Sequence, residues 1–136
     1  MKKKVQKIKT IEGRIWKLCK QIIREKYTHV CISCNKAVEG SSLHTGHYFR
    51  KRYLPLQMKY DLRLLRPQCS YCNLRLHGNL EWYTIGILRG HHASYLLEIA
   101  DDISKCVELS TPEKREFLLG LEKDYDIILK SYQRIA

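Results

Sequence analysis

Long apolar runs are missing from this sequence: none approaches the roughly 20 residues that a membrane-spanning helix requires. The basic start, MKKKVQKIK, leads into an amphipathic segment rather than into the apolar core of a secretory signal peptide. Internal repeats and low-complexity tracts are also lacking. We therefore expect a protein that does not associate with membranes and that stays in the cytosol, where thiols are kept reduced.

Acidic residues are scarce in the first three-fifths of the chain, and the net charge of +11 is concentrated there. Residues 1–30 contain ten Lys and Arg against two acids, and residues 42–77 contain seven against one, whereas residues 78–136 contain seven against ten. A basic surface concentrated in one part of a protein attracts the phosphate backbone of nucleic acids. We expect a nucleic-acid partner; a solvated basic face without a partner is the alternative interpretation.

Four of the six cysteines lie in two C-x2-C pairs, CISC and CSYC. In a reducing compartment such pairs are typical zinc ligands, because the short turn lets both thiolates face one ion at about 2.3 Å and a second pair completes the tetrahedron. Cys19 and Cys106 lie outside the pairs and are expected to be small, partly buried apolar residues. We predict a structural zinc ion bound by Cys31, Cys34, Cys69 and Cys72.

With 136 residues and 44% hydrophobic content, the chain is long enough for one domain with one modest core. We predict an α+β fold that forms a single domain over residues 1–136. In this fold a zinc-bound core at residues 31–80 lies between a basic N-terminal helix in residues 1–30 and a helical scaffold at residues 81–136. The zinc ion would tie the two ends of the core together.

Apolar residues at spacings of three and four predict a helix from about Lys7 to Tyr27. Between the cysteine pairs, LHTGHYF is predicted to form a short strand. The chain is predicted to be helical beyond Leu80, and its last helix begins with a cap at Ser110 or Thr111. The apolar stripe of that helix consists of Phe117, Leu121, Tyr125, Ile128 and Tyr132.

The segment that begins between the cysteine pairs contains residues suited to phosphodiester hydrolysis. Cleavage needs a deprotonated water, and a histidine has a pKa suited to that task near neutral pH, so we predict His47 as the general base. Cleavage also needs a hard divalent cation, Mg²⁺ or Mn²⁺, which prefers oxygen ligands and tolerates an imidazole. If a helix begins at the second cysteine pair, two side chains spaced by four residues share one face. The predicted ligands are Asp61, Asn73 and His77, with Asn79 in reserve.

The remaining histidines are assigned no catalytic role. His44 lies three residues before His47, so on a strand it faces the opposite side and is expected to be a hydrogen-bonded polar residue. His29, His91 and His92 lie where turns are expected.

Arginine and lysine side chains follow the predicted strand and flank the second cysteine pair. Arginine forks match phosphate oxygens, and aromatic side chains among them can stack on unpaired bases. No segment resembles a base-reading helix, so shape-selective or nonspecific DNA binding is expected. The predicted stacking residues are Tyr48, Tyr53 and Tyr71, and the predicted DNA-binding residues are Arg50, Lys51, Arg52, Arg63, Arg66 and Arg75.

The order of these signals is the layout of the HNH, or ββα-metal, nucleases. More specifically, the sequence resembles the phage NinG or Rap recombination endonucleases, which are related to HNH proteins. The resemblance covers about residues 31–90. It implies a zinc-bound, structure-selective DNA endonuclease that acts on branched recombination intermediates in a bacterial host. It rests on CISC, on GHY followed by Arg50, on Asp61, and on QCSYCN followed by Leu76, Gly78, Asn79 and Tyr83.

The sequence departs from the family pattern at two positions. Leu64 stands where relatives carry an asparagine that orients the catalytic histidine; Asp61 or a backbone carbonyl group is the candidate substitute. His77 stands where relatives have a small or polar residue, so its role as a ligand follows from the expected geometry alone.

Two other functions fit parts of the sequence. A non-catalytic zinc module that binds DNA junctions or other nucleic acid would explain Leu64 as the sign of a lost nuclease centre. A structural or partner-binding protein would use the acidic C-terminal helices, but it leaves the basic half unexplained. The sequence is compatible with a homo-oligomer and does not specify one.

Overall fold

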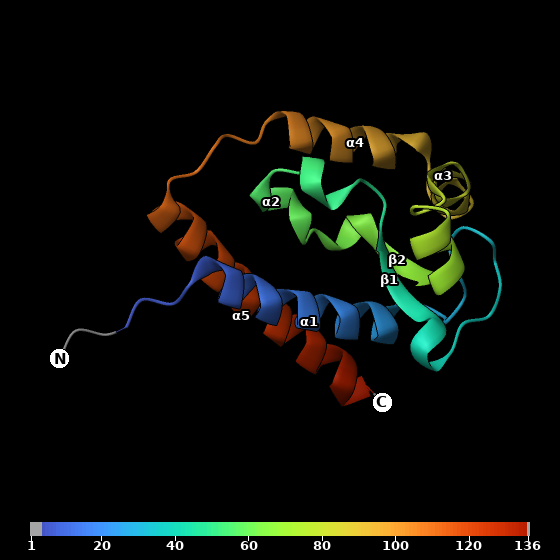
Figure 1. Ribbon diagram of the computed structural model, residues 1–136, viewed down its shortest axis with the longest axis horizontal. Helices are drawn as coiled ribbons and strands as arrows, with labels where there is room; N and C mark the ends of the chain where they lie inside the picture. Colours follow the sequence, from blue (N-terminus) through green and yellow to red (C-terminus); the bar gives the residue numbers. More distant parts are fainter. Residues whose placement is uncertain (1–3, 136) are drawn as a thin grey trace.

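The computed structural model describes residues 4–135, in which helices dominate and two strands form one small sheet. The expected α+β class is confirmed. In Figure 1, α4 lies on one side of the molecule and the pair formed by α1 and α5 lies on the other. The elements are α1 (Ile8–Lys26), β1 (Leu43–His47), α2 (Leu56–Lys59), β2 (Leu65–Cys69), α3 (Leu80–Leu88), α4 (Ala93–Ser104) and α5 (Thr111–Ile135).

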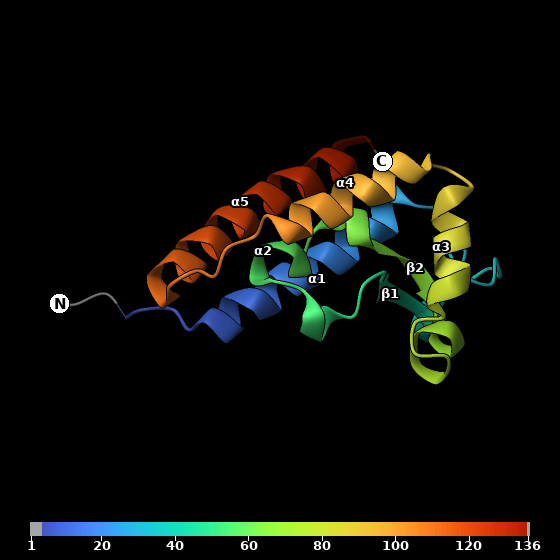
Figure 2. The same ribbon diagram turned by 90° about the horizontal axis from the view of Figure 1, so that it is seen from above.

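The main core forms between the first and the last helix, which run side by side in the same general direction (Figure 2). The predicted apolar stripe of α1 is buried at its centre, where Ile11, Ile15 and Ile22 are all 0% exposed, and its other two residues, Ile8 and Leu18, are partly buried. The centre of the α5 stripe is shifted by one residue from the prediction, because the helix turns Leu118 and Leu129 inward beside Tyr125. The other predicted stripe residues are partly buried at the edges of the core: Phe117, Leu121, Ile128 and Tyr132.

Polar contacts fix α1 and α5 against the segment that precedes β2. The hydroxyl group of Tyr125 donates to the backbone oxygen of Tyr60, and the hydroxyl group of Tyr60 donates to Glu12 at 3.0 Å. Arg14 of α1 pairs with Glu122 of α5, with 2.6 Å between Nε and Oε2. These contacts place the loop that carries Tyr60 directly on the helix pair.

A second core lies beneath α4 and contains the position where the family pattern has an asparagine. Leu64 is 0% exposed and packs with Leu54, Met58 and Ile99. The Leu64 side chain is therefore part of the hydrophobic core. Cys106 is half-buried beside this cluster, as expected, whereas Cys19 is fully buried in the main core and not partly buried.

The two strands pair antiparallel, with His47 opposite Leu65 and Gly46 opposite Arg66. Directly opposed residues share one face of a sheet, and neighbours along a strand point to opposite faces. His47 and Leu65 accordingly face α1, where Leu65 joins the main core. Arg66 leaves the sheet on the other face.

The chain beyond the second cysteine pair differs from the predicted short α-helix. Tyr71–Arg75 form a π-helix, which ends before His77. His77, Gly78 and Asn79 all have positive φ, at 51°, 95° and 43°. The expectation that Asn73 and His77 share a helix face is therefore wrong, because His77 lies outside the helix in the left-handed region that favours glycine.

The later helices follow the prediction closely. α3 and α4 begin at Leu80 and Ala93, and α4 ends at Ser104, so most of the chain beyond Leu80 is helical, as predicted. Ser110 caps α5, since its Oγ accepts the Glu113 N–H while Glu113 accepts the Ser110 N–H. Within residues 4–135 no helix is long and apolar enough to cross a membrane.

Candidate metal centre and nucleic-acid cleft

The four cysteines of the two C-x2-C pairs come together in one cluster. Their sulfur atoms all lie within 4.8 Å of one another, and 3.8 Å separates the sulfurs of Cys34 and Cys69. A tetrahedral zinc ion with Zn–S distances of about 2.3 Å sets its ligands roughly 3.8 Å apart. The donor set therefore fits zinc, and its members are Cys31, Cys34, Cys69 and Cys72.

Hydrogen-bond donors point at the sulfur atoms, as expected for thiolates that bind a metal ion. The N–H of Cys34 donates to the sulfur of Cys31 at 3.5 Å, and the N–H of Cys72 donates to the sulfur of Cys69 at 3.3 Å. The side-chain amide of Asn79 donates to the sulfur of Cys72 at 3.5 Å. Asn79, the reserve ligand for a catalytic cation, thus contacts the cysteine cluster.

Burial and hydrogen bonding act in opposite directions on the thiols. Burial tends to raise the pKa of Cys31, but backbone N–H groups that bond its sulfur outweigh burial, and the pKa is lowered. Burial raises the pKa of Cys72 to about 12, although the bond from Asn79 lowers it in part. A divalent cation would offset the repulsion among four thiolates in this cluster.

Gln68 and α3 hold the two cysteine pairs in position. The Gln68 side chain donates to the Ser33 hydroxyl at 2.9 Å and to the Gly78 backbone oxygen at 2.6 Å, so it joins both pairs. On the other side, α3 approaches the first pair at Gly86. A Cβ atom on Gly86 would lie 2.1 Å from the backbone oxygen of Ile32, so only glycine permits this contact.

A cleft of about 420 Å³ beside the cysteine cluster collects most of the predicted catalytic and DNA-binding residues. In the part of the chain that the structure describes, none of the residues that line it is acidic. Six of the predicted site residues line it: His47, Arg50, Lys51, Arg52, Asn73 and His77.

His47 is held by a backbone carbonyl group. Its Nε2 lies 3.0 Å from the backbone oxygen of Lys59, and because a carbonyl oxygen only accepts, Nε2 carries the proton. Nδ1 is then the basic nitrogen. Burial lowers the pKa of His47, and the positive charge of Lys51 lowers it further. The imidazole is therefore neutral at neutral pH.

Asn73 bonds to His44, the histidine expected to be a hydrogen-bonded polar residue. His44 Nε2 lies 3.1 Å from the backbone oxygen of Ser41 and therefore carries the proton, which leaves Nδ1 to accept from Asn73 Nδ2 at 3.0 Å. The expectation for His44 is confirmed. The amide oxygen of Asn73 stays available as a ligand or acceptor.

Asp61 lies apart from the other predicted ligands and does not line the cleft. Its Oδ1 accepts from the backbone N–H of Arg63 at 2.9 Å, and its Oδ2 accepts from Nη2 of Arg63 at 2.8 Å. Arg63 also pairs with Asp102 of α4, at 2.8 Å. Asp61 and Arg63 are thus both engaged in an ion-pair network that links the turn before β2 to α4.

The predicted DNA-binding residues have three different environments. Arg50, Lys51 and Arg52 are exposed at the cleft, and Arg75 is exposed but does not line the cleft. Arg66 is only 3% exposed and opens into a different pocket. Of the predicted stacking residues, Tyr53 and Tyr71 are 70% and 61% exposed, whereas Tyr48 packs against Phe49 and Tyr83.

The sequence model of the family described as "Bacteriophage Lambda NinG protein" matches residues 1–116. This chain belongs to the NinG family. Membership implies a role related to phage recombination. No curated protein and no solved structure matches the chain.

Three residues that shape this site in the NinG-family protein were not predicted from the sequence. Trp16 stacks on His47, the Lys59 carbonyl group binds His47, and Gln68 joins the cysteine pairs. The position of a polar residue directly before the second cysteine pair could have indicated Gln68. Nothing local indicated Trp16 or Lys59, because the fold brings each to His47 from another element.

Proposed function

We propose that this NinG-family protein is a metal-dependent DNA endonuclease that acts on branched or partly single-stranded DNA. The convergence of His47, Asn73 and His77 with Arg50, Lys51 and Arg52 in one cleft carries the proposal. These residues come from β1, from the turn after it and from the segment after the second cysteine pair. The cysteine cluster, with zinc bound, ties those segments together.

In the proposed reaction His47 takes a proton from the attacking water. The Lys59 carbonyl group fixes the imidazole with Nδ1 as the basic atom, and the lowered pKa keeps that atom unprotonated at neutral pH. The carbonyl group thus does for His47 what the asparagine at position 64 does in relatives. Arg50 and Arg52 are exposed at the cleft and would hold the phosphate oxygens.

A bound Mg²⁺ or Mn²⁺ would neutralise the charge that develops on the phosphate and on the leaving oxygen. The cleft offers the amide oxygen of Asn73 and the ring of His77 as ligands. Because hard cations prefer oxygen and commonly use carboxylates, these two ligands alone bind weakly. DNA phosphate oxygens would therefore have to complete the cation site, unless Asp61 leaves Arg63 to reach it.

The absence of an acid from the residues that line the cleft, within the described residues, favours a second candidate function. A zinc module that binds DNA junctions without cutting them needs the basic cleft and the cysteine cluster but no cation. Salt dependence separates both candidates from a purely protein-binding role, because phosphate contacts weaken steeply as salt rises.

The deciding experiment is cleavage of a labelled panel of branched and linear DNAs by the zinc-loaded protein, with and without Mg²⁺ or Mn²⁺. His47→Ala is compared with the parent and with His92→Ala, which removes an exposed histidine that does not line the cleft. Zinc content and DNA binding are measured for all three proteins.

Cutting that requires the added cation, persists in His92→Ala and is lost in His47→Ala supports the nuclease. Binding without cutting under every ion overturns it and leaves the junction-binding module. Cutting that persists in His47→Ala removes His47 from the mechanism.

A further inference from the structure

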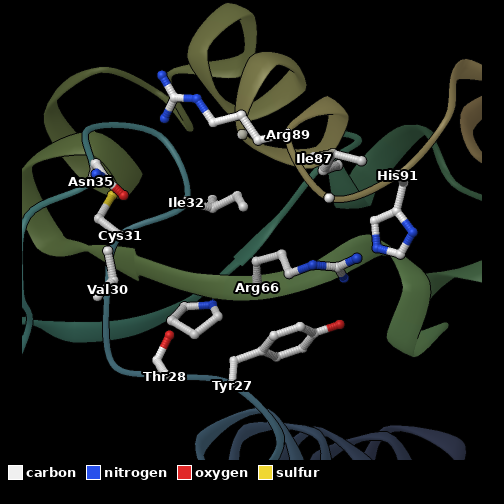
Figure 3. Close-up of a pocket in the computed structure, with 13 residues that line it drawn as sticks. Tyr27, Thr28, Val30, Cys31, Ile32, Asn35, Arg66, Ile87, Arg89 and His91 are labelled. Atoms are coloured by element: carbon white, nitrogen blue, oxygen red, sulfur yellow. The ribbon is translucent and has the colours of Figure 1, made fainter.

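A second basic pocket lies on the opposite face of the sheet from His47. Its volume is about 290 Å³, and it lies between the end of α1, the first cysteine pair, β2 and the end of α3 (Figure 3). We call it the Arg66 pocket. No residue lines both this pocket and the cleft that contains His47.

The Arg66 pocket holds a buried positive charge that no carboxylate neutralises. Arg66 is 3% exposed, and within residues 4–135 it forms no ion pair with an acid. Nη1 donates to the backbone oxygens of Leu65 at 2.8 Å, Arg63 at 3.2 Å and Leu62 at 3.5 Å, and Nη2 donates to the Tyr95 hydroxyl at 3.0 Å, which leaves the Nε edge for an anion. The guanidinium also lies 4.7 Å from the ring centroid of Tyr27. Carbonyl dipoles and aromatic faces offset a buried charge only in part.

The lining of the pocket adds the positive charge of Arg89 and no negative charge. Arg89 and His91 are exposed where α3 ends, and none of the residues that line the pocket is acidic in the described part of the molecule. In Figure 3, Arg66 extends along the pocket from β2 toward His91. A basic pocket with apolar walls concentrates its positive potential, which favours an anion that fits a guanidinium fork.

We infer that the Arg66 pocket binds a phosphate group. Arg66 supplies a rigid guanidinium held in place by Tyr27 and Tyr95, and His91 lies beside its end, while Arg89 lines the pocket farther from it (Figure 3). The phosphate belongs either to the DNA backbone or to a small phosphate ligand such as a nucleotide. The DNA source rests on the proposed DNA-binding function, and there it gives the protein a contact to a second DNA segment, on the other face of the sheet from the cleft.

The first test is an NMR titration of the zinc-loaded full chain with inorganic phosphate at constant ionic strength. The Nε–H signal of Arg66 and the backbone N–H signals of Gly90 and His91 are expected to shift and to saturate. Shifts that grow linearly without saturating, or that are confined to residues 50–52 at the cleft, overturn the inference.

Variants at the rim of the pocket test phosphate binding without replacing Arg66, whose burial makes the fold sensitive to its loss. Arg89→Gln with His91→Gln removes two exposed side chains and is expected to weaken phosphate binding about tenfold, as the loss of one charge-assisted hydrogen bond does. Lys20→Gln, which removes one exposed charge from α1 away from the pocket, is the control and should bind like the parent. Equal affinity of the rim variant and the control overturns the inference. Arg66→Lys keeps the charge but loses the fork, and it should bind phosphate more weakly while it retains zinc.

Competition identifies the source of the phosphate. If a short duplex with a single-stranded tail moves the Arg66 signal and the rim variant weakens that effect, the phosphate belongs to DNA. If a nucleoside monophosphate moves the signal and the DNA does not, the pocket binds a small ligand. Neither result depends on cleavage, so the nuclease proposal can fail while the phosphate site stands, and the reverse holds as well.

Discussion

The imidazole of His47 stacks on the indole of Trp16, with 4.9 Å between the ring centroids and 17° between the ring planes. Trp16 belongs to α1, so the first helix covers the candidate general base while its other side packs against α5. The basic N-terminal helix is therefore part of the candidate site.

Replacing this tryptophan should raise the pKa of His47. Burial is the largest cause of the lowered pKa, so Trp16→Leu, which uncovers the ring, is expected to move the pKa upward toward its ordinary value. An NMR titration of the His47 ring protons measures the change. Trp82→Leu, at the exposed tryptophan of α3, is the matched control and should leave the pKa unchanged. A His47 pKa that is the same in both variants contradicts the prediction.

The stability of the protein should fall in mild acid because of the same histidine. The folded-state pKa of His47 is lowered, so below about pH 6.5 the unfolded chain binds the proton more readily than the folded chain. The contribution of neutral His47 to the free energy of unfolding is fully present above that pH, and it is lost as the pH falls toward the folded-state pKa. Urea unfolding across this range should show a smaller decrease for His47→Gln than for the parent. Equal decreases for the two proteins would remove His47 as a cause.

The Asp61 and Arg63 pair should act on stability and not on cleavage. Asp61 caps the turn before β2 and pairs with Arg63, so Asp61→Asn and Arg63→Met are each expected to lower the free energy of unfolding by about 1–2 kcal/mol. Urea unfolding and the cleavage assay are run on both variants. Cleavage that is lost in Asp61→Asn but kept in Arg63→Met would instead make Asp61 a cation ligand.

Asn79 should contribute to zinc affinity, whereas Asn73 should not. Asn79 donates to the sulfur of Cys72, and partners of this kind typically change metal affinity by 10- to 100-fold, so Asn79→Ala should release zinc to a chelator more readily than the parent by about that factor. Asn73→Ala is the control, because Asn73 bonds His44 and no sulfur. Zinc affinity that falls equally in both variants contradicts the assignment of Asn79.

Gly86 should be irreplaceable at the contact between α3 and the first cysteine pair. Gly86→Ala places a methyl group against the backbone oxygen of Ile32, which cannot move without disturbing the cluster, so the variant should lose about 1–3 kcal/mol of stability. Gly120→Ala in α5 meets open space and should be neutral or stabilising, because alanine favours helix. Denaturant unfolding compares the two. Similar stability for both variants would show that α3 can shift away.

The features that the sequence predicted correctly depend on local patterns. The apolar spacing of Ile11, Ile15 and Ile22 specified α1, and the cap at Ser110 located the start of α5. The cysteine cluster was also predictable, since a C-x2-C turn brings two sulfurs together whatever the remaining fold.

The features that the sequence did not reveal depend on contacts between distant elements. Nothing in the sequence distinguishes Arg66 from the exposed arginines. The strand register turns its side chain to the face of the sheet opposite Leu65, where Tyr27 and Tyr95 enclose it. His77 was placed on a helix face with Asn73 because a helix was expected to begin at the second cysteine pair, whereas the π-helix that forms there ends too early to include His77. The orientation of His47 depends on the Lys59 carbonyl group. Because every residue has a backbone carbonyl group, the sequence cannot indicate which one bonds the imidazole.

The packing of α1 against α5 also affects the order in which parts of the fold can form during synthesis on the ribosome. The four cysteines of the cysteine cluster are all synthesised before α3, so the cluster can form early around Gln68. The apolar face of α1, by contrast, packs against only two buried residues from other elements, Tyr60 and Leu65, until Leu118, Tyr125 and Leu129 have been synthesised. The first helix to appear is thus fully covered only when the last one has formed, and until then part of its apolar stripe is exposed to other chains.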